Sequence, residues 1–416
     1  MRVLGAAVAV MFAVIVPASA AFAQTAPDPS APSAATPTPP SLPPGIPTVD
    51  PPVDPTAPPA PPVVPIADPS PKVAVVMAQL HVLDAQQALV TADAALDAAK
   101  ADETRVRNAR DAARSDRDDK RATLTAVATD AYVRGGNDVA GSEPATMDEY
   151  LPAESARLLT SRAIDHDQSQ LQDAESRLRA AEGVLSGAVS RTGQAQSARD
   201  AAQTANDDAV TAVSDARRLT SAKDVSPTVM GDAVLTADEI VGWYNAQGVT
   251  GYVGKVDIAT MAALYIDEGT SEQIRGDVAF AQSIVETGAF TSPLTTHNNF
   301  AGIGACDSCP TGFDFTTPQL GVRAQAQLLH AYADKTLRIS TLANPAIGSN
   351  PDHLSVRGCC ATWNKLTGTW ASDPNYGPKL MTVYLSMLQY ALAQRTLAPP
   401  TPPALPAAPL ASIAGH

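Results

Sequence analysis

Two long stretches of the chain repeat apolar residues at seven-residue intervals. In residues 152–223 the repeat is carried by alanine, at Ala174, Ala181, Ala188, Ala195, Ala202, Ala209 and Ala216. A second series has the same step, at Ile164, Leu171, Leu178 and Leu185. Residues 72–134 show the same seven-residue repeat of apolar residues and contain neither proline nor glycine. Sustained heptads are typical of coiled coils, and the glycine-rich break at residues 135–144 favours an antiparallel turn. The pattern therefore predicts a coiled-coil hairpin over residues 72–225.

Residues 226–396 follow a different pattern. Helical periodicity appears in five shorter segments, which are residues 236–247, 257–267, 275–287, 320–333 and 377–394. This region also holds 15 of the chain's 19 aromatic residues, enough for one domain with its own core. We expect a mainly α globular domain with one small β-hairpin near residues 312–316.

The two ends of the chain carry no such periodicity. Residues 1–23 combine Arg2, an apolar run and a small-residue end, which predicts a cleaved signal peptide and export. Residues 24–71 contain 19 of the 36 prolines and predict an extended linker. Residues 397–416 repeat this composition and predict a disordered tail.

Charge and cysteine content narrow the function classes. The net charge of -14 and the pI near 4.8 argue against nucleic-acid binding, which calls for a basic face. Export makes the four cysteines disulfide candidates, and the sequence leaves their pairing open among Cys306, Cys309, Cys359 and Cys360. A four-thiolate zinc site is the alternative, but two adjacent cysteines lack the usual spacer between ligands. We expect no metal and no cofactor.

Glu286 is the most informative residue of the globular region. It is the single carboxylate between residues 278 and 306, a segment with no lysine or arginine. It falls in the last turn of a predicted helix, among phenylalanines, and both features raise the pKa of a carboxyl group. A glutamic acid that stays protonated near neutral pH can act as a general acid. The alternative is an exposed glutamate at a helix end, with no chemical role.

Three motifs around this residue resemble one family. The segment DVAFAQSIVETGAF holds Gln282, Glu286, Thr287 and Gly288; the segment HNNFAGIG follows it; and WASDPNYGPKL lies about 80 residues later. Together they resemble the endo-β-N-acetylglucosaminidase domain of bacterial cell-wall hydrolases, glycoside hydrolase family 73. Ala301, inserted before the glycine of the second motif, departs from the family pattern.

The resemblance implies a lysozyme-like α fold and peptidoglycan as the substrate, cut after N-acetylglucosamine. Glu286 would be the general acid and Tyr376 a second residue of the active site. The implied substrate-binding residues are Asn298, Asn299, Phe300, Gly302, Asp373 and Trp370. Trp363 is the weaker candidate for sugar stacking, since tryptophan in a small domain is as often part of the core.

The second catalytic group is left open. Glycosidases usually pair the acid with another carboxylate, but no glutamate follows Glu286 in this chain. Asp314, between two phenylalanines, is our predicted base, Asp307 is the other carboxylate in the region, and the N-acetyl group of the substrate is a third option. His297 is interpreted as a loop residue.

The predicted hairpin has a resemblance of its own. The segments ATDAYVRGGN and LLTSRAIDHDQSQLQ are similar to N-terminal coiled coils of exported cell-wall hydrolases. This implies a secreted, wall-associated enzyme that a membrane-bound divisome or wall-remodelling activator controls through the hairpin, or a hairpin that is only a spacer. Two other functions remain open: a non-enzymatic wall-binding scaffold, and a muramidase or lytic transglycosylase.

Overall fold

The computed structural model describes residues 65–139, 147–219, 225–305, 312–347 and 357–397. The predicted signal peptide, nearly all of the proline-rich linker and the tail from residue 398 lie outside these ranges, as do Cys306, Asp307 and Cys309. The described residues form helices, joined by turns and three isolated β-bridges, without a sheet. The prediction of a mainly α protein is therefore confirmed.

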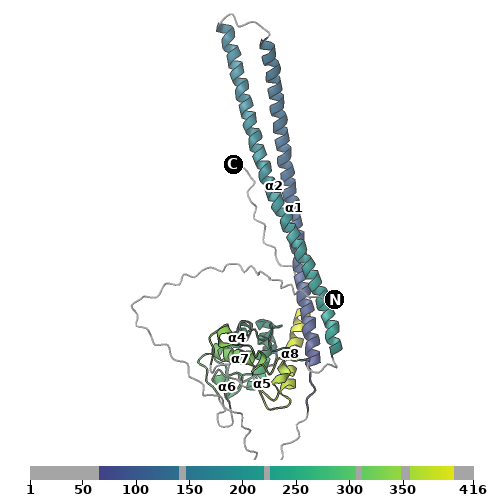
Figure 1. Ribbon diagram of the computed structural model, residues 1–416, viewed down its shortest axis with the longest axis vertical. Helices are drawn as coiled ribbons and strands as arrows, with labels where there is room; N and C mark the ends of the chain where they lie inside the picture. The colour runs from purple at the N-terminus through teal and green to yellow at the C-terminus, as the bar shows by residue number, and fades with distance from the viewer. Residues whose placement is uncertain (1–64, 140–146, 220–224, 306–311, 348–356, 398–416) are drawn as a thin grey trace, which may run out of the picture. The chain divides into compact units, whose positions relative to one another are not determined.

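The two heptad stretches form the long helices α1 (Ser70–Val139) and α2 (Met147–Arg218), which lie side by side (Figure 1). Along the predicted seam, Ala174, Ala188 and Ala216 are buried, and the other alanines of the series are partly buried. Small side chains let the two helices approach closely. The coiled-coil hairpin is thus confirmed, although α1 continues through Gly135 and Gly136 of the predicted break.

Cross-helix ion pairs show that α1 and α2 are antiparallel. As the residue number rises on one helix, it falls on the other, in the pairs Arg121–Glu175, Arg177–Asp116, Arg191–Asp102 and Arg199–Asp93. Surface pairs of this kind are worth about 0–1 kcal/mol each. They contribute to the register of the hairpin more than to its stability.

The globular region contains the remaining helices. These are α3 (Ala237–Ala246), α4 (Ile258–Ser271), α5 (Gly276–Thr287), α6 (Pro293–Thr296), α7 (Pro318–Ala333), η2 (Ile339–Thr341), η4 (Trp363–Leu366) and α8 (Tyr376–Leu397). The five predicted helices correspond to α3, α4, α5, α7 and α8. Polar caps help to set three of the starts, through Thr236, Asp257 and Thr317.

The prediction of a small β-hairpin near residues 312–316 is wrong. The described residues there form no strand; instead, the Phe313 amide donates to the Ile303 carbonyl, and the Phe315 amide to the His297 carbonyl. These bonds fasten the segment to the preceding loop. The alternation of aromatic and polar residues reflects this attachment rather than a ladder.

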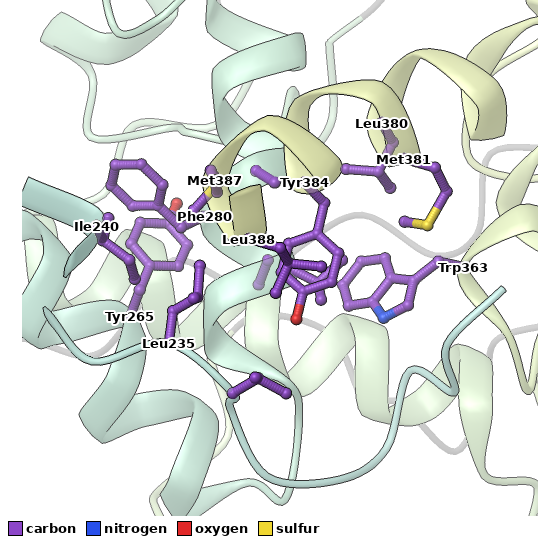
Figure 2. Packing of buried hydrophobic residues seen from close by; sticks show 14 of the residues in the cluster. Leu235, Ile240, Tyr265, Phe280, Trp363, Leu380, Met381, Tyr384, Met387 and Leu388 are labelled. Atoms are coloured by element: carbon purple, nitrogen blue, oxygen red, sulfur yellow. The ribbon is translucent and has the colours of Figure 1, made fainter. Parts of the chain in front are cut away.

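Helix α5 runs through the core and carries Glu286 at its end. From Gly276 to Ser283 every residue is buried, which is the pattern of a helix packed on all sides. Figure 2 shows Phe280 in the same cluster as Tyr384 and Leu388 of α8. A Cβ on Gly276 would lie 2.1 Å from the carbonyl oxygen of Tyr265, so only glycine permits the contact between α4 and α5.

Asp277 anchors the other end of α5. Its Oδ2 accepts hydrogen bonds from the amides of Val234 and Leu235 and from the Tyr384 hydroxyl. Burial raises the pKa of this fully enclosed carboxyl group, and the donors oppose the shift. The first turn of the helix that bears Glu286 is therefore fixed to the segment before α3 and to α8.

The first turns of α1 belong to the core of the globular region. Val73, Val76 and Leu80 are buried in the same cluster as the side chains of α8, and Asp84 pairs with Arg395 at 2.7 Å. By length and composition, this part of α1 could also cross a membrane. A core helix of a soluble protein meets the same criteria. Val73, Val76 and Leu80 are buried in the protein core.

Candidate active site

The chain reverses directly after Glu286. Gly288 adopts a left-handed conformation with φ 59°, and Ala289 and Phe290 follow it with φ 61° each. Thr287 stabilises this unusual turn: its hydroxyl donates to the Ser283 carbonyl at 2.6 Å and accepts from the Phe290 amide at 2.8 Å. Non-glycine residues in this region of φ/ψ space cost about 1 kcal/mol or more each. The buried Phe290 ring and the Thr287 bonds offset that cost.

The carboxyl group of Glu286 contacts residues from three separate parts of the domain. Its Oε1 accepts a hydrogen bond of 2.6 Å from the Tyr376 hydroxyl, and the Trp370 side chain is close enough to lower the pKa of the carboxyl group as well. Its Oε2 lies against Gly302, where an added Cβ would stand 3.5 Å away. Burial raises the pKa of Glu286, and the Tyr376 and Trp370 side chains partly oppose the shift. The result is an acid that stays protonated to higher pH than an exposed glutamate.

The loop that follows α6 is built by asparagines. Asn299 accepts from the Ile303 amide and donates to the carbonyls of Ile303 and Phe313, while Asn298 donates to the Phe315 carbonyl. Both asparagines and Phe300 are buried. Their predicted sugar contacts are not available in this conformation, because the side chains shape the loop from within. Through this loop they present Gly302 to Glu286.

The start of α8 places Tyr376. The Asp373 carbonyl accepts from the Tyr376 amide, and its carboxylate accepts from the Asn375 amide and from Lys379. Asp373 thus organises the turn, while its predicted contact with the substrate stays a prediction. Burial and the nearby Glu286 carboxylate raise the pKa of Tyr376 well above its ordinary value. The phenol therefore stays neutral and serves as a donor.

The two tryptophan candidates differ in position. Trp363 is fully buried, and its indole donates to the Thr228 carbonyl, so it belongs to the core. Trp370 is partly exposed and lies with its ring centroid 5.4 Å from that of Tyr332. Its effect on the pKa of Glu286 was not anticipated, since the motif suggested only a stacking surface.

The second carboxylate stays a prediction. The Asp314 side chain is 70% exposed, with Oδ2 lying 3.5 Å from Nδ1 of His297. Among the described residues, no other carboxylate contributes to the pKa shift of Glu286. Asp314 is therefore not coupled to the acid in the way that two adjacent carboxylates would be.

Cys359 and Cys360 form a disulfide with each other. This is one of the three pairings that the sequence left open, and it leaves Cys306 and Cys309, which are outside the described residues, without a described partner. Within the described part of the chain, no group of three or more histidine, cysteine, aspartate or glutamate side chains could hold a metal ion.

Comparison with known proteins agrees with this geometry. Residues 262–389 match the family of glucosaminidases described as mannosyl-glycoprotein endo-beta-N-acetylglucosaminidase. An uncharacterized protein of Borreliella burgdorferi is 35% identical over 142 residues, which are 33% of this chain and 67% of that protein. The chain belongs to the glucosaminidase family. No solved structure matches the chain.

The matched part of the glucosaminidase domain runs from α4 into α8. It contains all three motifs, so Glu286, Gly302 and Tyr376 all lie within it. Membership makes the domain a glycan hydrolase in general terms and implies a glycan as its ligand. Residues 226–261, including α3, and the first turns of α1 lie outside the match but pack in the same core.

Two glutamines of this site were not predicted. Gln282 donates to the Tyr376 oxygen at 2.8 Å, and Gln325 of α7 donates to Gln282 at the same distance. Gln282 was noted as a motif residue without a role. A glutamine among the buried positions of α7, between Ala324 and Ala326, is the one signal that could have pointed to Gln325.

We expect Tyr376→Phe to lower kcat by about 10- to 100-fold. A hydrogen bond to a charged group is worth about 1.5–3 kcal/mol, and tenfold in rate corresponds to about 1.4 kcal/mol. A general acid must be protonated to act, so if Glu286 has that role, activity falls as the pH rises through its pKa. Losing the phenol raises that pKa, and the alkaline limb of the pH–kcat profile should move to higher pH.

Tyr384→Phe is the matched control. Tyr384 is also on α8 and donates to a buried carboxylate, Asp277, at 2.8 Å. Its loss should lower the melting temperature and leave the alkaline limb in place. Equal pH profiles for the two variants would contradict the assigned role of Tyr376.

Proposed function

We propose that the protein is an exported peptidoglycan hydrolase that cleaves the β-1,4 glycosidic bond after N-acetylglucosamine, with Glu286 as the general acid. The observation that carries this proposal is the setting of Glu286: a carboxyl group whose pKa is raised by burial, which accepts a hydrogen bond from Tyr376 and lies beside Gly302. Family membership supplies the glycan as ligand class. The predicted signal peptide supports export.

Proton donation in this arrangement follows from the hydrogen bonds. Oε1 is engaged by the phenol, which assigns the transferable proton to Oε2 on the Gly302 side. As the proton passes to the glycosidic oxygen, negative charge develops on Glu286. The Tyr376 hydroxyl, already donating to Glu286, stabilises that charge, a form of electrostatic preorganisation.

A direct experiment identifies the bond that is cut. The full-length protein is incubated with purified peptidoglycan, and the new chain ends are analysed by mass spectrometry. Reducing N-acetylglucosamine ends are expected. Reducing muramyl ends would indicate a muramidase, and the absence of cleavage would indicate a non-enzymatic wall-binding scaffold.

A lytic transglycosylase is the second candidate. It is favoured by one observation: among the described residues, no second carboxylate acts on Glu286. A reaction that uses one acid and the substrate's own groups does not need one. Anhydro-muramyl ends in the same experiment would establish this activity and overturn the proposed bond specificity.

We also propose that the hairpin regulates the site, in response to a wall-remodelling activator in the membrane. The support is a set of contacts between the hairpin's base and the segment from η4 to α8. Asn364 donates to Asp68 at 2.9 Å and to Ser70 at 3.1 Å, and its amide donates to Ser226, which follows α2, at 3.2 Å. The amide of Ile66 also donates to the side chain of Asn375, the residue before Tyr376, at 3.0 Å.

A double-mutant cycle tests this coupling. Ala174→Glu places a charge in the buried seam of the hairpin and should lower kcat, because a loosened hairpin no longer holds its base against Asn364. In an Asn364→Ala background the same change should have a smaller effect. Coupled positions deviate from additivity by about 0.5–3 kcal/mol; additive effects would count against transmission through Asn364.

A further inference from the structure

A line of buried polar side chains lies behind Tyr376. The members are Tyr265, Gln282, Ser283 and Gln325, none of which is more than 1% exposed. They come from α4, α5 and α7 and are joined to one another by hydrogen bonds. Buried polar groups in such networks are costly if left unpaired, so the direction of each bond matters.

One backbone carbonyl sets that direction. Nε2 of Gln325 lies 3.1 Å from the carbonyl oxygen of Ala279, which can only accept. The nitrogen of the Gln325 amide must therefore face this carbonyl, and its oxygen faces the hydroxyls of Tyr265 and Ser283. The second hydrogen on Nε2 is directed at Gln282, 2.8 Å away.

The direction passes through Gln282 to the phenol. Because Gln325 donates, the atom of Gln282 that faces it must be Oε1, and Nε2 then faces the Tyr376 oxygen at 2.8 Å. The phenol oxygen accepts this bond, and its own hydrogen is free to be donated to another group. That hydrogen points to Oε1 of Glu286 at 2.6 Å.

We propose that Gln325 is a positioning residue for the reaction: through Gln282 it keeps the Tyr376 hydroxyl donating to Glu286 in both protonation states of the acid. The inference rests on the proposed role of Glu286 as the general acid. With the donor fixed in advance, the carboxylate that forms during proton transfer is stabilised without reorganisation. Gln325 itself does not contact Glu286 or the surface.

Replacement of Gln325 should therefore change the pKa of Glu286 and not only the stability of the domain. In Gln325→Met, Gln282 can turn its amide over and accept the phenol hydrogen whenever Glu286 is protonated, which favours the protonated acid. We expect the alkaline limb of the pH–kcat profile to shift to higher pH by on the order of half a pH unit. The value of kcat should be several-fold lower and KM unchanged.

Gln327→Met is the matched control. Gln327 is two residues away on α7 and equally enclosed, but its amide bonds Glu272 and the carbonyls of Asn344 and Pro345, away from Tyr376. Its loss should lower the melting temperature by a similar amount and leave the pH profile unchanged. Matching profiles for the two variants would show that Gln325 is merely structural.

Gln282→Glu tests the link through Gln282 directly, should Gln325→Met fail to fold. The new carboxylate is nearly isosteric, accepts the phenol hydrogen and adds a negative charge. We expect the pKa of Glu286 to rise by on the order of one unit or more. A carbon-13 NMR titration, with the Glu286 signal assigned by its loss in Glu286→Gln, measures this pKa without any assay of activity.

The two proposals fail in different ways. If Glu286→Gln kept full activity, the general-acid assignment would be wrong, whatever Gln325 does. If Glu286→Gln were inactive but Gln325→Met and Gln282→Glu left the pKa of Glu286 unchanged, only the positioning role would be rejected.

Discussion

Glu286→Gln should fold like the parent chain and lose about 10²- to 10⁴-fold of its hydrolytic rate, the usual contribution of a general acid. The amide has the same shape as the carboxyl group and can still accept the Tyr376 hydrogen bond. It cannot supply the proton to the glycosidic oxygen. Release of reducing ends from purified peptidoglycan, followed over a range of pH, measures the loss.

The stability of Glu286→Gln, unlike its activity, should not fall. Burial disfavours the charged form of Glu286, as its raised pKa indicates, so a neutral amide removes a desolvation cost. At pH values where Glu286 is ionised, we expect the melting temperature of Glu286→Gln to equal or exceed that of the parent. A strongly lowered melting temperature would mean that the lost activity reflects unfolding.

The same assay resolves the second carboxylate. If Asp314 is the base, Asp314→Asn should reduce the rate nearly as much as Glu286→Gln. If the substrate's N-acetyl group assists instead, Asp314→Asn should be almost silent, because the side chain is largely exposed and pairs with His297 alone among its ionic contacts in the described residues. Substrates that lack the N-acetyl group would then be cleaved poorly.

A chain that begins at residue 226 should be too unstable to remain folded at room temperature. It lacks Val73, Val76 and Leu80, which are buried in the core against α8. Burying one such side chain contributes about 1.5–3 kcal/mol, so the loss of all three removes about 4.5–9 kcal/mol, against a typical total stability of about 5–15 kcal/mol. Thermal unfolding followed by circular dichroism compares this chain with the full-length protein.

A shortened hairpin is the control for this truncation. Whole heptads are removed from the far parts of α1 and α2, while the connection at residues 140–146 and the base of the hairpin are kept. The globular region of this variant should melt at the temperature of the parent. If the chain from residue 226 were as stable as the shortened variant, the first turns of α1 would be a spacer and not part of the domain.

Local pattern predicted much of this protein. The alanine heptads predicted the hairpin and its seam, because a seven-residue repeat puts one set of side chains on a common face of each helix. The positions of α5 and α8 followed, to within a few residues, from helical periodicity. The motifs around Glu286 and Tyr376 predicted which residues meet, through resemblance to the family.

Other features depended on contacts that no local pattern records. Asn298, Asn299 and Phe300 were assigned to the ligand, yet they are buried and shape the loop from inside. Residues 312–316 alternate like a strand, but within the described parts of the chain their backbone amides bond to the preceding loop. The residues Val73, Val76 and Leu80 were assigned to the hairpin, yet they are buried in the core of the globular region.

The sequence by itself determined the helices, the coiled coil and the isolation of Glu286 among apolar neighbours, because these depend on residues a few positions apart. Only the tertiary structure decided how that carboxyl group is held. Tyr376 lies 90 positions from Glu286, and Gln325 lies 43 positions from Gln282. The direction of their hydrogen bonds depends on one backbone carbonyl, that of Ala279, and on the exclusion of water around it. Periodicity reports which face of a helix is buried, whereas the partner that meets that face is chosen by packing of the whole domain.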